Sequence, residues 1–306
     1  MLKNNYKDGF YNYEWRLKEK TKKEYRYNNL IKPQWKGEDL DHKVILIISE
    51  QGLGDIIQFS RYIFDLKNRY NVKIIFQTHK KLFHIFENKG LNLISKIDIL
   101  PYHDYFIYLL SLPKLYFELN KELLGEISYI GSNKKNYNKW KNILTKFKSP
   151  LVGINWCGSQ KVGKKDKSIP FDIIKSLFKL PNIEFLSLQK EEGEKDLVNY
   201  KSNKNFYNFS NIIDKKNYFE DTVEIIKFLD LVITNDTSVA HLSATLGLKT
   251  WILLEKNPDW RWFLKNNKSP WYKSVRLFRQ KKRGDWDNLV KEIKIELLIF
   301  YKQFNK

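Results

Sequence analysis

Cysteine is almost absent from this sequence of 306 residues, which contains only Cys157. One cysteine cannot form an internal disulfide or a thiolate metal cluster, so the sequence predicts a protein of a reducing compartment without a zinc site. Long hydrophobic runs are also lacking, and none approaches the roughly 20 residues that span a bilayer. Residues 1–23 lack the apolar stretch of a secretory signal, and we therefore expect a cytoplasmic protein.

Acidic residues are outnumbered, because 35 Asp and Glu face 55 Lys and Arg, which gives a formal net charge of +20. Such a charge favours anionic partners, since lysine and arginine release counterions when they contact phosphate. The lysines are scattered along the whole chain without an aromatic and basic platform, so we interpret most of them as solvated and expect no nucleic acid partner. A basic surface would still attract a phosphorylated donor, or anionic lipid in a peripheral association with the inner face of the membrane.

Short β-branched runs that end in glycine or small polar residues predict strands of parallel sheets. The first run, 43–48, is followed by a glycine loop and by a helical pattern whose apolar residues extend to Leu66. This order recurs at 72–76, 82–86 and 105–110, and a second series has strands at 151–156, 183–188, 231–233 and 250–254. The alternation predicts an α/β protein with two Rossmann-like, doubly wound parallel sheets that face each other across a cleft.

Four segments are expected along the chain. They are a helical N-terminal extension over 1–40, a first sheet domain over 41–148, a second over 149–284 and a C-terminal helix over 285–306. The helical spacing of residues 10–23 and 286–304 predicts that both flanks pack on the sheets.

One nearly complete phosphate-binding motif lies after the strand at 151–156. Residues 158–165 almost match a P-loop, but Lys165 stands where a hydroxyl would hold magnesium, and Pro170 interrupts the helix that should follow. We therefore reject an NTPase, although the lysine-rich loop could neutralise a diphosphate.

The glycine loop after the first strand resembles the start of a dinucleotide-binding fingerprint. Ile57 replaces its third glycine, and the next strand runs into Gln77 and Thr78 without a carboxylate for a ribose. A dehydrogenase is therefore not expected.

Residues 233–242 run from an apolar strand into a helix through small polar residues. Thr237 or Ser238 can cap that helix, which leaves backbone N–H groups and the positive helix end to bind an anion. His241 lies one turn after Thr237 and shares its face. In the structural alternative Asp236 caps the helix and His241 packs, and the chemistry alone does not decide between the two.

Asp55 closes the glycine loop after the first strand. A carboxylate at this place could accept the proton of an attacking hydroxyl as a general base. Glu50 and Gln51 add polar groups, and a loop with Gly52 and Gly54 needs no bulky anchor, so we favour this function over an N-cap.

A series of short motifs extends along nearly the whole chain. They are Glu50-Gln51-Gly52-Leu53-Gly54-Asp55, Gln58-Phe59, Arg61-Tyr62, Lys167-Ser168-Ile169-Pro170, Ser187-Leu188-Gln189-Lys190, Asp236-Thr237-Ser238-Val239-Ala240-His241-Leu242, Pro258-Asp259-Trp260-Arg261-Trp262, Ser269-Pro270-Trp271-Tyr272 and Gly284-Asp285-Trp286. In this order they resemble bacterial glycosyltransferases related to the lipopolysaccharide heptosyltransferases, glycosyltransferase family nine, in the branch often fused to tetratricopeptide repeats.

The resemblance implies a GT-B fold and an inverting, metal-independent glycosyltransferase of the hexosyl- or heptosyl-transfer class without a cofactor. It implies a nucleotide diphosphate sugar as donor, held by the second domain, and a glycan, lipid-linked glycan or protein hydroxyl as acceptor. By position, Asp55 would be the catalytic base beside the acceptor loop of Glu50, Gln51, Gly52 and Gly54. The donor-binding residues would be Trp156, Lys167, Gln189, Lys190, Asp236, Thr237, Ser238 and His241.

Two features depart from that family. Lys167 stands where arginine is usual, and lysine cannot make the same planar, two-pronged contact with phosphate. Only residues 9–16 resemble the repeat array, as its final helix, so the acceptor would be taken differently or from a separate partner. The alternative function is a catalytically silent binding or scaffold protein with the same fold, which donor turnover would distinguish from the transferase.

Overall fold

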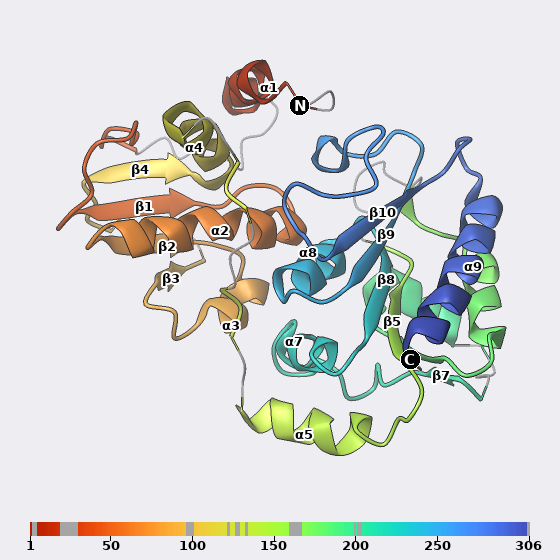
Figure 1. Ribbon diagram of the computed structural model, residues 1–306. Coiled ribbons are helices and arrows are strands. Elements are labelled where there is room, and N and C mark those ends of the chain that lie inside the picture. Colours follow the sequence, from red (N-terminus) through yellow and green to blue (C-terminus); the bar gives the residue numbers. More distant parts are fainter. Residues whose placement is uncertain are drawn as a thin grey trace. The chain divides into compact units, whose positions relative to one another are not determined.

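The computed structural model describes residues 1, 5–18, 30–95, 101–120, 123–125, 129–131, 134–158, 167–198, 200 and 204–304 (Figure 1). The chain divides into two compact units, Met1–Gly131 and Ser132–Lys306. Within the described residues, no helix is both long enough and apolar enough to cross a membrane.

The first unit is built on a parallel sheet with the order β3-β2-β1-β4. Its strands are β1 (Val44–Ile48), β2 (Lys73–Gln77), β3 (Asn92–Ile94) and β4 (Tyr105–Tyr108). Its helices are α1 (Tyr6–Tyr13), η1 (Glu14–Lys18), α2 (Leu53–Arg69), η3 (Lys80–Leu82), α3 (Phe83–Phe86), η4 (Leu109–Ser111) and α4 (Leu112–Asn120). The last four residues of β1 are buried because helices cover a parallel sheet on its faces.

The second unit contains a parallel sheet with the order β10-β9-β8-β5-β6-β7. Its strands are β5 (Leu151–Asn155), β6 (Glu184–Ser187), β7 (Phe206–Tyr207), β8 (Leu231–Asn235), β9 (Thr250–Leu254) and β10 (Val275–Arg279). Its helices are α5 (Lys134–Leu144), α6 (Phe171–Ile174), η6 (Lys175–Lys179), η7 (Glu191–Leu197), α7 (Glu220–Ile226), α8 (Ser238–Thr245), η8 (Trp260–Trp262) and α9 (Trp286–Phe304). The prediction of two doubly wound parallel sheets is confirmed, but the strand predicted at 82–86 is wrong, because these residues belong to η3 and α3.

The division between the units falls ahead of the boundary expected at residue 149. Helix α5 packs on α7, where the Trp140 indole N–H donates to Asp221 Oδ1 at 2.6 Å and the rings of Tyr137 and Phe228 lie 5.0 Å apart. These contacts place α5 in the second unit.

The two flanking helices differ in what they cover. The apolar stripe of α9 joins the core of the second sheet, as expected. Phe10 of α1 is buried and lies 6.0 Å from the ring of Phe117 on α4, so α1 packs on a helix, whereas Leu17 of η1 reaches the first sheet. Residues 19–23 of the predicted N-terminal helix lie outside the described residues.

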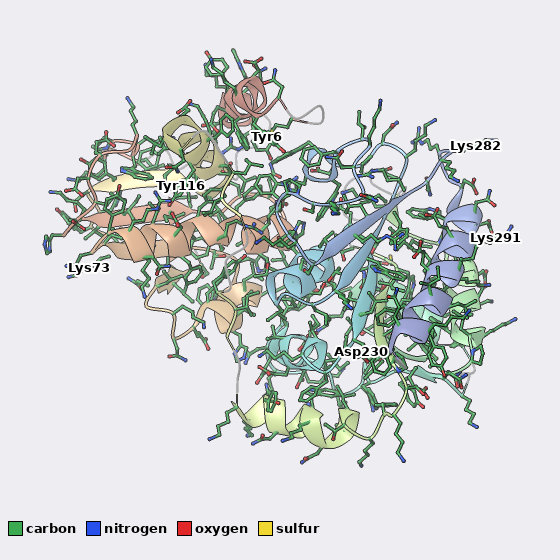
Figure 2. All side chains as sticks on the ribbon, viewed as in Figure 1. Tyr6, Lys73, Tyr116, Asp230, Lys282 and Lys291 are labelled. Carbon is green, nitrogen blue, oxygen red and sulfur yellow. The ribbon has the colours of Figure 1, made fainter. Side chains whose placement is uncertain are left out.

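Lysines stand on the surface of both units. Lys73, Lys282 and Lys291 are exposed, as their labelled side chains in Figure 2 illustrate. This distribution agrees with the interpretation of most of the positive charge as solvated surface.

Candidate functional site

The second sheet changes its direction of winding between β5 and β8, since the chain continues from β5 to β6 on one side and from β8 to β9 on the other. Parallel sheets bind ligands at the carboxyl edge of such a switch point. Both strands end there in a buried asparagine, and the Asn155 Nδ2 group donates to Asn235 Oδ1 at 3.0 Å. Asn235 in turn donates to the backbone carbonyl of Lys167 at 2.8 Å. The two side chains tie three segments together at this edge.

Helix α8 begins at the same edge with its N-cap residue Thr237 in an extended conformation. The Thr237 hydroxyl does not cap the helix. It instead lies 3.3 Å from Asn155 Nδ2 and 3.2 Å from the Thr234 hydroxyl. Asp236 precedes the N-cap position, so the structural alternative in which Asp236 caps α8 is wrong. The start of α8 therefore carries the partial positive charge of a helix N-terminus without a side-chain cap from Thr237.

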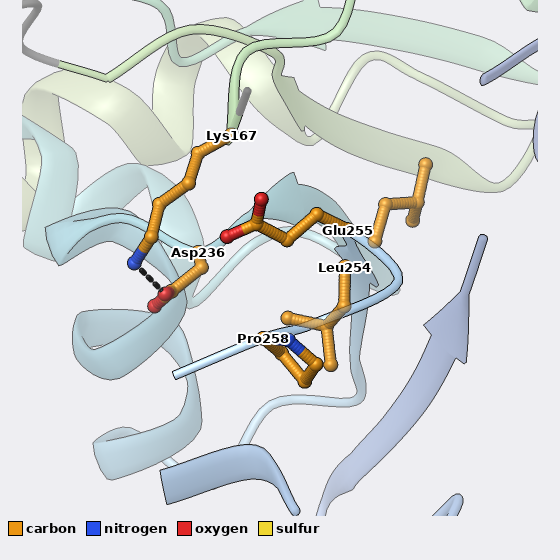
Figure 3. Close-up of a pocket in the computed structure, with 6 residues that line it drawn as sticks. Lys167, Asp236, Leu254, Glu255 and Pro258 are labelled. Carbon is orange, nitrogen blue, oxygen red and sulfur yellow. Dashed lines mark hydrogen bonds and ion pairs between the residues drawn. The ribbon is translucent and has the colours of Figure 1, made fainter. Parts of the chain in front are cut away.

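An ion pair between Lys167 and Asp236 lies beside the start of α8 (Figure 3). The two side chains are only 22% and 11% exposed. Burial lowers the pKa of Lys167, but the Asp236 carboxylate outweighs it and raises the pKa above the ordinary value. Lys167 therefore stays positively charged at neutral pH. The pair lines a shallow pocket together with Leu253, Leu254, Glu255 and Pro258.

A second ion pair follows β9, where Arg261 Nη1 lies 2.6 Å from Asp259 Oδ1. Burial opposes ionisation of Asp259, but the positive charges of Arg261 and Lys167 lower its pKa below the ordinary value. Two carboxylates and two cations are thus close together at the carboxyl edge of the second sheet.

The loop after β1 carries the predicted catalytic carboxylate in the first unit. Asp55 is the third residue of α2, and its Oδ2 atom accepts from the Gly52 N–H at 2.9 Å. The carboxylate is half-buried and takes part in capping from the third helical position, whereas the N-cap residue, expected as Asp55 in the structural alternative, is Gly52. Capping does not exclude proton acceptance, so the catalytic role of Asp55 stays a prediction.

Glu50, Gln51, Gly52 and Gly54 lie in the same loop or at the start of α2. Glu50 is buried and both of its carboxylate oxygens accept from Arg16. Gln51 is exposed, has a left-handed backbone with φ of 63°, and donates to the Tyr13 hydroxyl at 2.6 Å. These contacts join the loop to the N-terminal helices.

Comparison with known proteins bears on the fold. No family model matches the chain. The chain resembles a family 9 glycosyl transferase from Veillonella parvula with a TM-score of 0.59, 13% identity and coverage of 80% of this chain and 88% of that one. It resembles the ADP-heptose lps heptosyltransferase II of E. coli with a TM-score of 0.56, 12% identity and coverage of 86% and 99%. The chain has the GT-B glycosyltransferase fold.

Two further proteins are similar. E. coli heptosyltransferase WaaC with ADP-2-deoxy-2-fluoro heptose shares this GT-B fold with a TM-score of 0.51, 10% identity and coverage of 86% of this chain and 100% of that one. Protein FlbA of Caulobacter vibrioides is 21% identical over 280 residues, which are 83% of this chain and 46% of that protein. The chain thus spans just under half the length of this relative.

Gln189 is buried and connects two backbone segments of the second unit. Its Oε1 atom accepts from the N–H groups of Trp156 and Cys157 at 3.0 and 2.8 Å, and its Nε2 group donates to the carbonyls of Cys157 and Lys190 at 2.9 and 2.8 Å. The amide thereby fixes the backbone that follows β5. Trp156 is also buried, and its indole N–H donates to Asp196 Oδ2 at 2.8 Å.

Lys190 and His241 are held by protein groups. Lys190 forms an ion pair with Asp214, and burial lowers the pKa of this lysine. His241 is buried, stacks on Trp262 at 5.2 Å and lies 3.1 Å from the Tyr272 hydroxyl. The packing alternative for His241 is therefore observed, and a contact of either residue with a donor stays a prediction.

Several residues of this site were missed in the sequence. Asn155, Asn235 and Asp259 were not among the candidates, although all three lie at the carboxyl edge of the second sheet. The signal for Asn155 and Asn235 was an asparagine at the end of each of the apolar runs that form β5 and β8. The lysine-rich residues 159–166 lie outside the described residues.

Proposed function

We propose that this chain is an inverting glycosyltransferase that takes a sugar from a nucleotide diphosphate donor bound at the start of α8. The observation that carries the proposal is the convergence of Lys167, Asp236 and Thr237 at the β5–β8 switch point of a GT-B fold. Helix N-termini at such edges favour phosphate, because backbone N–H groups and the helix dipole attract negative charge.

The Lys167 ammonium supplies the stabilisation that the leaving group needs. Negative charge develops on the diphosphate as the glycosidic bond breaks, and a fixed cation together with a helix N-terminus can stabilise that charge without a metal. Asp236 holds the lysine in place and keeps it protonated. We accordingly propose metal-independent transfer.

Asp55 is the base that we propose for the acceptor hydroxyl. A carboxylate held by the Gly52 N–H has a fixed orientation, which proton abstraction requires. Inversion at the anomeric carbon follows from direct attack by that hydroxyl. The acceptor belongs to a glycan, a lipid-linked glycan or a protein.

The donors to test first carry ADP. The E. coli neighbours are described as an ADP-heptose transferase and as WaaC bound to an ADP-heptose analogue, which motivates this choice. UDP, GDP and CDP sugars complete the panel.

Titration calorimetry with ADP, UDP, GDP and CDP tests donor binding. We expect at least one nucleoside diphosphate to bind, and Lys167→Met to weaken its binding by about tenfold, the equivalent of one charge-assisted contact. Lys175→Met is the matched control, since Lys175 is a half-exposed lysine of the same unit that pairs with exposed Asp172. Failure of all four nucleotides to bind wild-type protein would reject the proposal.

Release of nucleoside diphosphate from the corresponding sugars separates an enzyme from a silent scaffold. A transferase releases nucleoside diphosphate slowly in water, by hydrolysis of the donor, and faster with an acceptor, by transfer of the sugar to the acceptor hydroxyl, whereas a scaffold binds the donor and leaves it intact. Binding without any turnover would favour the scaffold.

A further inference from the structure

The N-terminal segment reaches the loop that carries Asp55. Arg16 of η1 donates from Nε to Glu50 Oε1 at 3.0 Å and from Nη2 to Glu50 Oε2 at 2.9 Å. The two side chains are 7% and 1% exposed, so the two-pronged pair is shielded from water. A guanidinium in this geometry fixes both the distance and the plane of the carboxylate.

Further contacts surround the pair on every side that the structure describes. Glu50 Oε2 accepts from the Leu110 N–H at 3.2 Å, and Arg16 Nη2 donates to the Ser111 hydroxyl at 2.8 Å. Arg16 Nη1 also lies 2.6 Å from Glu14 Oε1, so the one guanidinium is shared by two carboxylates. The network thus joins η1 to the residues that follow β1 and β4.

The next two residues of the loop are also held. The Gln51 amide donates to the Tyr13 hydroxyl at 2.6 Å, and this contact accompanies a left-handed backbone at Gln51, which is unfavourable for a non-glycine residue. The Gly52 N–H then donates to Asp55 Oδ2 at 2.9 Å. Three successive residues therefore have fixed positions between Arg16 and the Asp55 carboxylate.

We propose that Arg16 is a positioning residue, which holds the loop from Glu50 to Gly52 so that Asp55 is aligned for proton abstraction. This inference rests on the proposed role of Asp55. Loss of the guanidinium leaves the Glu50 carboxylate buried without its partner, and the loop must move to hydrate it. A displacement of about 1 Å at a reacting group costs up to about a hundredfold in rate.

The experiment combines hydrogen–deuterium exchange with turnover in full-length protein. We expect Arg16→Ala to raise amide exchange at residues 50–55 and to lower kcat between about 10- and 100-fold for the nucleotide sugar that wild-type protein consumes fastest. KM for the donor and the dissociation constant of its nucleoside diphosphate should stay unchanged. Arg16→Lys should recover part of kcat, because lysine keeps the charge but not the two-pronged contact.

Arg276→Ala is the matched control. Arg276 makes a two-pronged pair with Glu296 in the second unit, at 2.7 and 2.6 Å. Its loss should lower the melting temperature and leave exchange at 50–55 and kcat unchanged. Tyr13→Phe, which removes the hydroxyl that accepts from the Gln51 amide, gives a milder variant if Arg16→Ala does not fold.

The outcomes separate this inference from the proposed function. Unchanged exchange at 50–55 in the Arg16 and Tyr13 variants, or an equal rise in the Arg276 control, overturns the positioning role. Absence of turnover in wild-type protein instead rejects the transferase, and the exchange arm still decides whether Arg16 holds the loop.

Discussion

Lys167 and Asp236 form an ion pair at the carboxyl edge of the second sheet, although 69 positions separate them in the chain. The pair joins the segment after β5 to the start of α8. Because both side chains are mostly buried, loss of either one leaves its partner as an uncompensated buried charge. Their relationship has consequences for stability as well as for donor binding.

Removal of the Lys167 charge should lower stability in a pH-dependent way. We expect Lys167→Met to lose about 1–3 kcal/mol in urea unfolding at pH 7, since Asp236 is left without its cation. The pKa of Lys167 in the folded protein lies above its ordinary value of 10.5. The ion pair therefore contributes its full free energy of stabilisation below pH 10.5, and this contribution is lost as the pH rises through the pKa of the folded protein. The difference between wild type and variant should therefore shrink above pH 10.5. A difference that grows there would contradict the assigned pair.

Substitution of the proposed base should affect rate more than stability. Asp55→Asn keeps an oxygen that can accept from the Gly52 N–H, so the capping bond can persist and the unfolding free energy should fall by only about 1 kcal/mol or less. Loss of the base should lower kcat by roughly 10²- to 10⁴-fold. Initial rates with the preferred donor and acceptor measure this effect. A variant as active as wild type would remove Asp55 from the mechanism.

We expect Gln189 to stabilise the fold and not to bind the donor. Gln189→Leu leaves the N–H groups of Trp156 and Cys157 without their shared acceptor, which we expect to cost about 2–4 kcal/mol of unfolding free energy. Nucleoside diphosphate affinity, measured below the onset of unfolding, should change less than fivefold, an effect under about 1 kcal/mol. A large loss of affinity in a fully folded variant would instead assign Gln189 to the donor.

Chelation tests the proposal that no metal is required. Protein dialysed against EDTA should keep its full rate of donor turnover, because the charge of the leaving group is met by Lys167 and the start of α8. The control is the same protein with magnesium restored. A rate that disappears with EDTA and returns with magnesium would refute metal independence.

Local sequence patterns predicted much of the fold. The helical stripe predicted over 286–304 is α9, and the β-branched run at 43–48 contains β1, because periodicity reports directly on burial. The edge strand β10 was missed since Arg276 and Arg279 interrupt its apolar residues, and its partner is fixed only by the tertiary fold.

Some residues of the candidate site could likewise be predicted from local sequence patterns, and others could not. Asp236 and Thr237 were found because they join a strand to a helix within a few residues. The contact of Asn155 with Asn235 could not be predicted, since it depends on which strands lie side by side. The backbone contacts of Gln189 likewise depend on the path of a loop that no local pattern specifies.

The residues proposed to bind the donor all belong to the unit Ser132–Lys306, whereas the proposed base Asp55 and the proposed positioning residue Arg16 belong to the unit Met1–Gly131. If this division holds, substitutions that change the choice of sugar and substitutions that change the choice of acceptor would fall in different halves of the chain. Chimaeras that exchange halves between relatives should inherit donor preference with the later half of the chain, which offers a practical route to enzymes with new pairs of substrates.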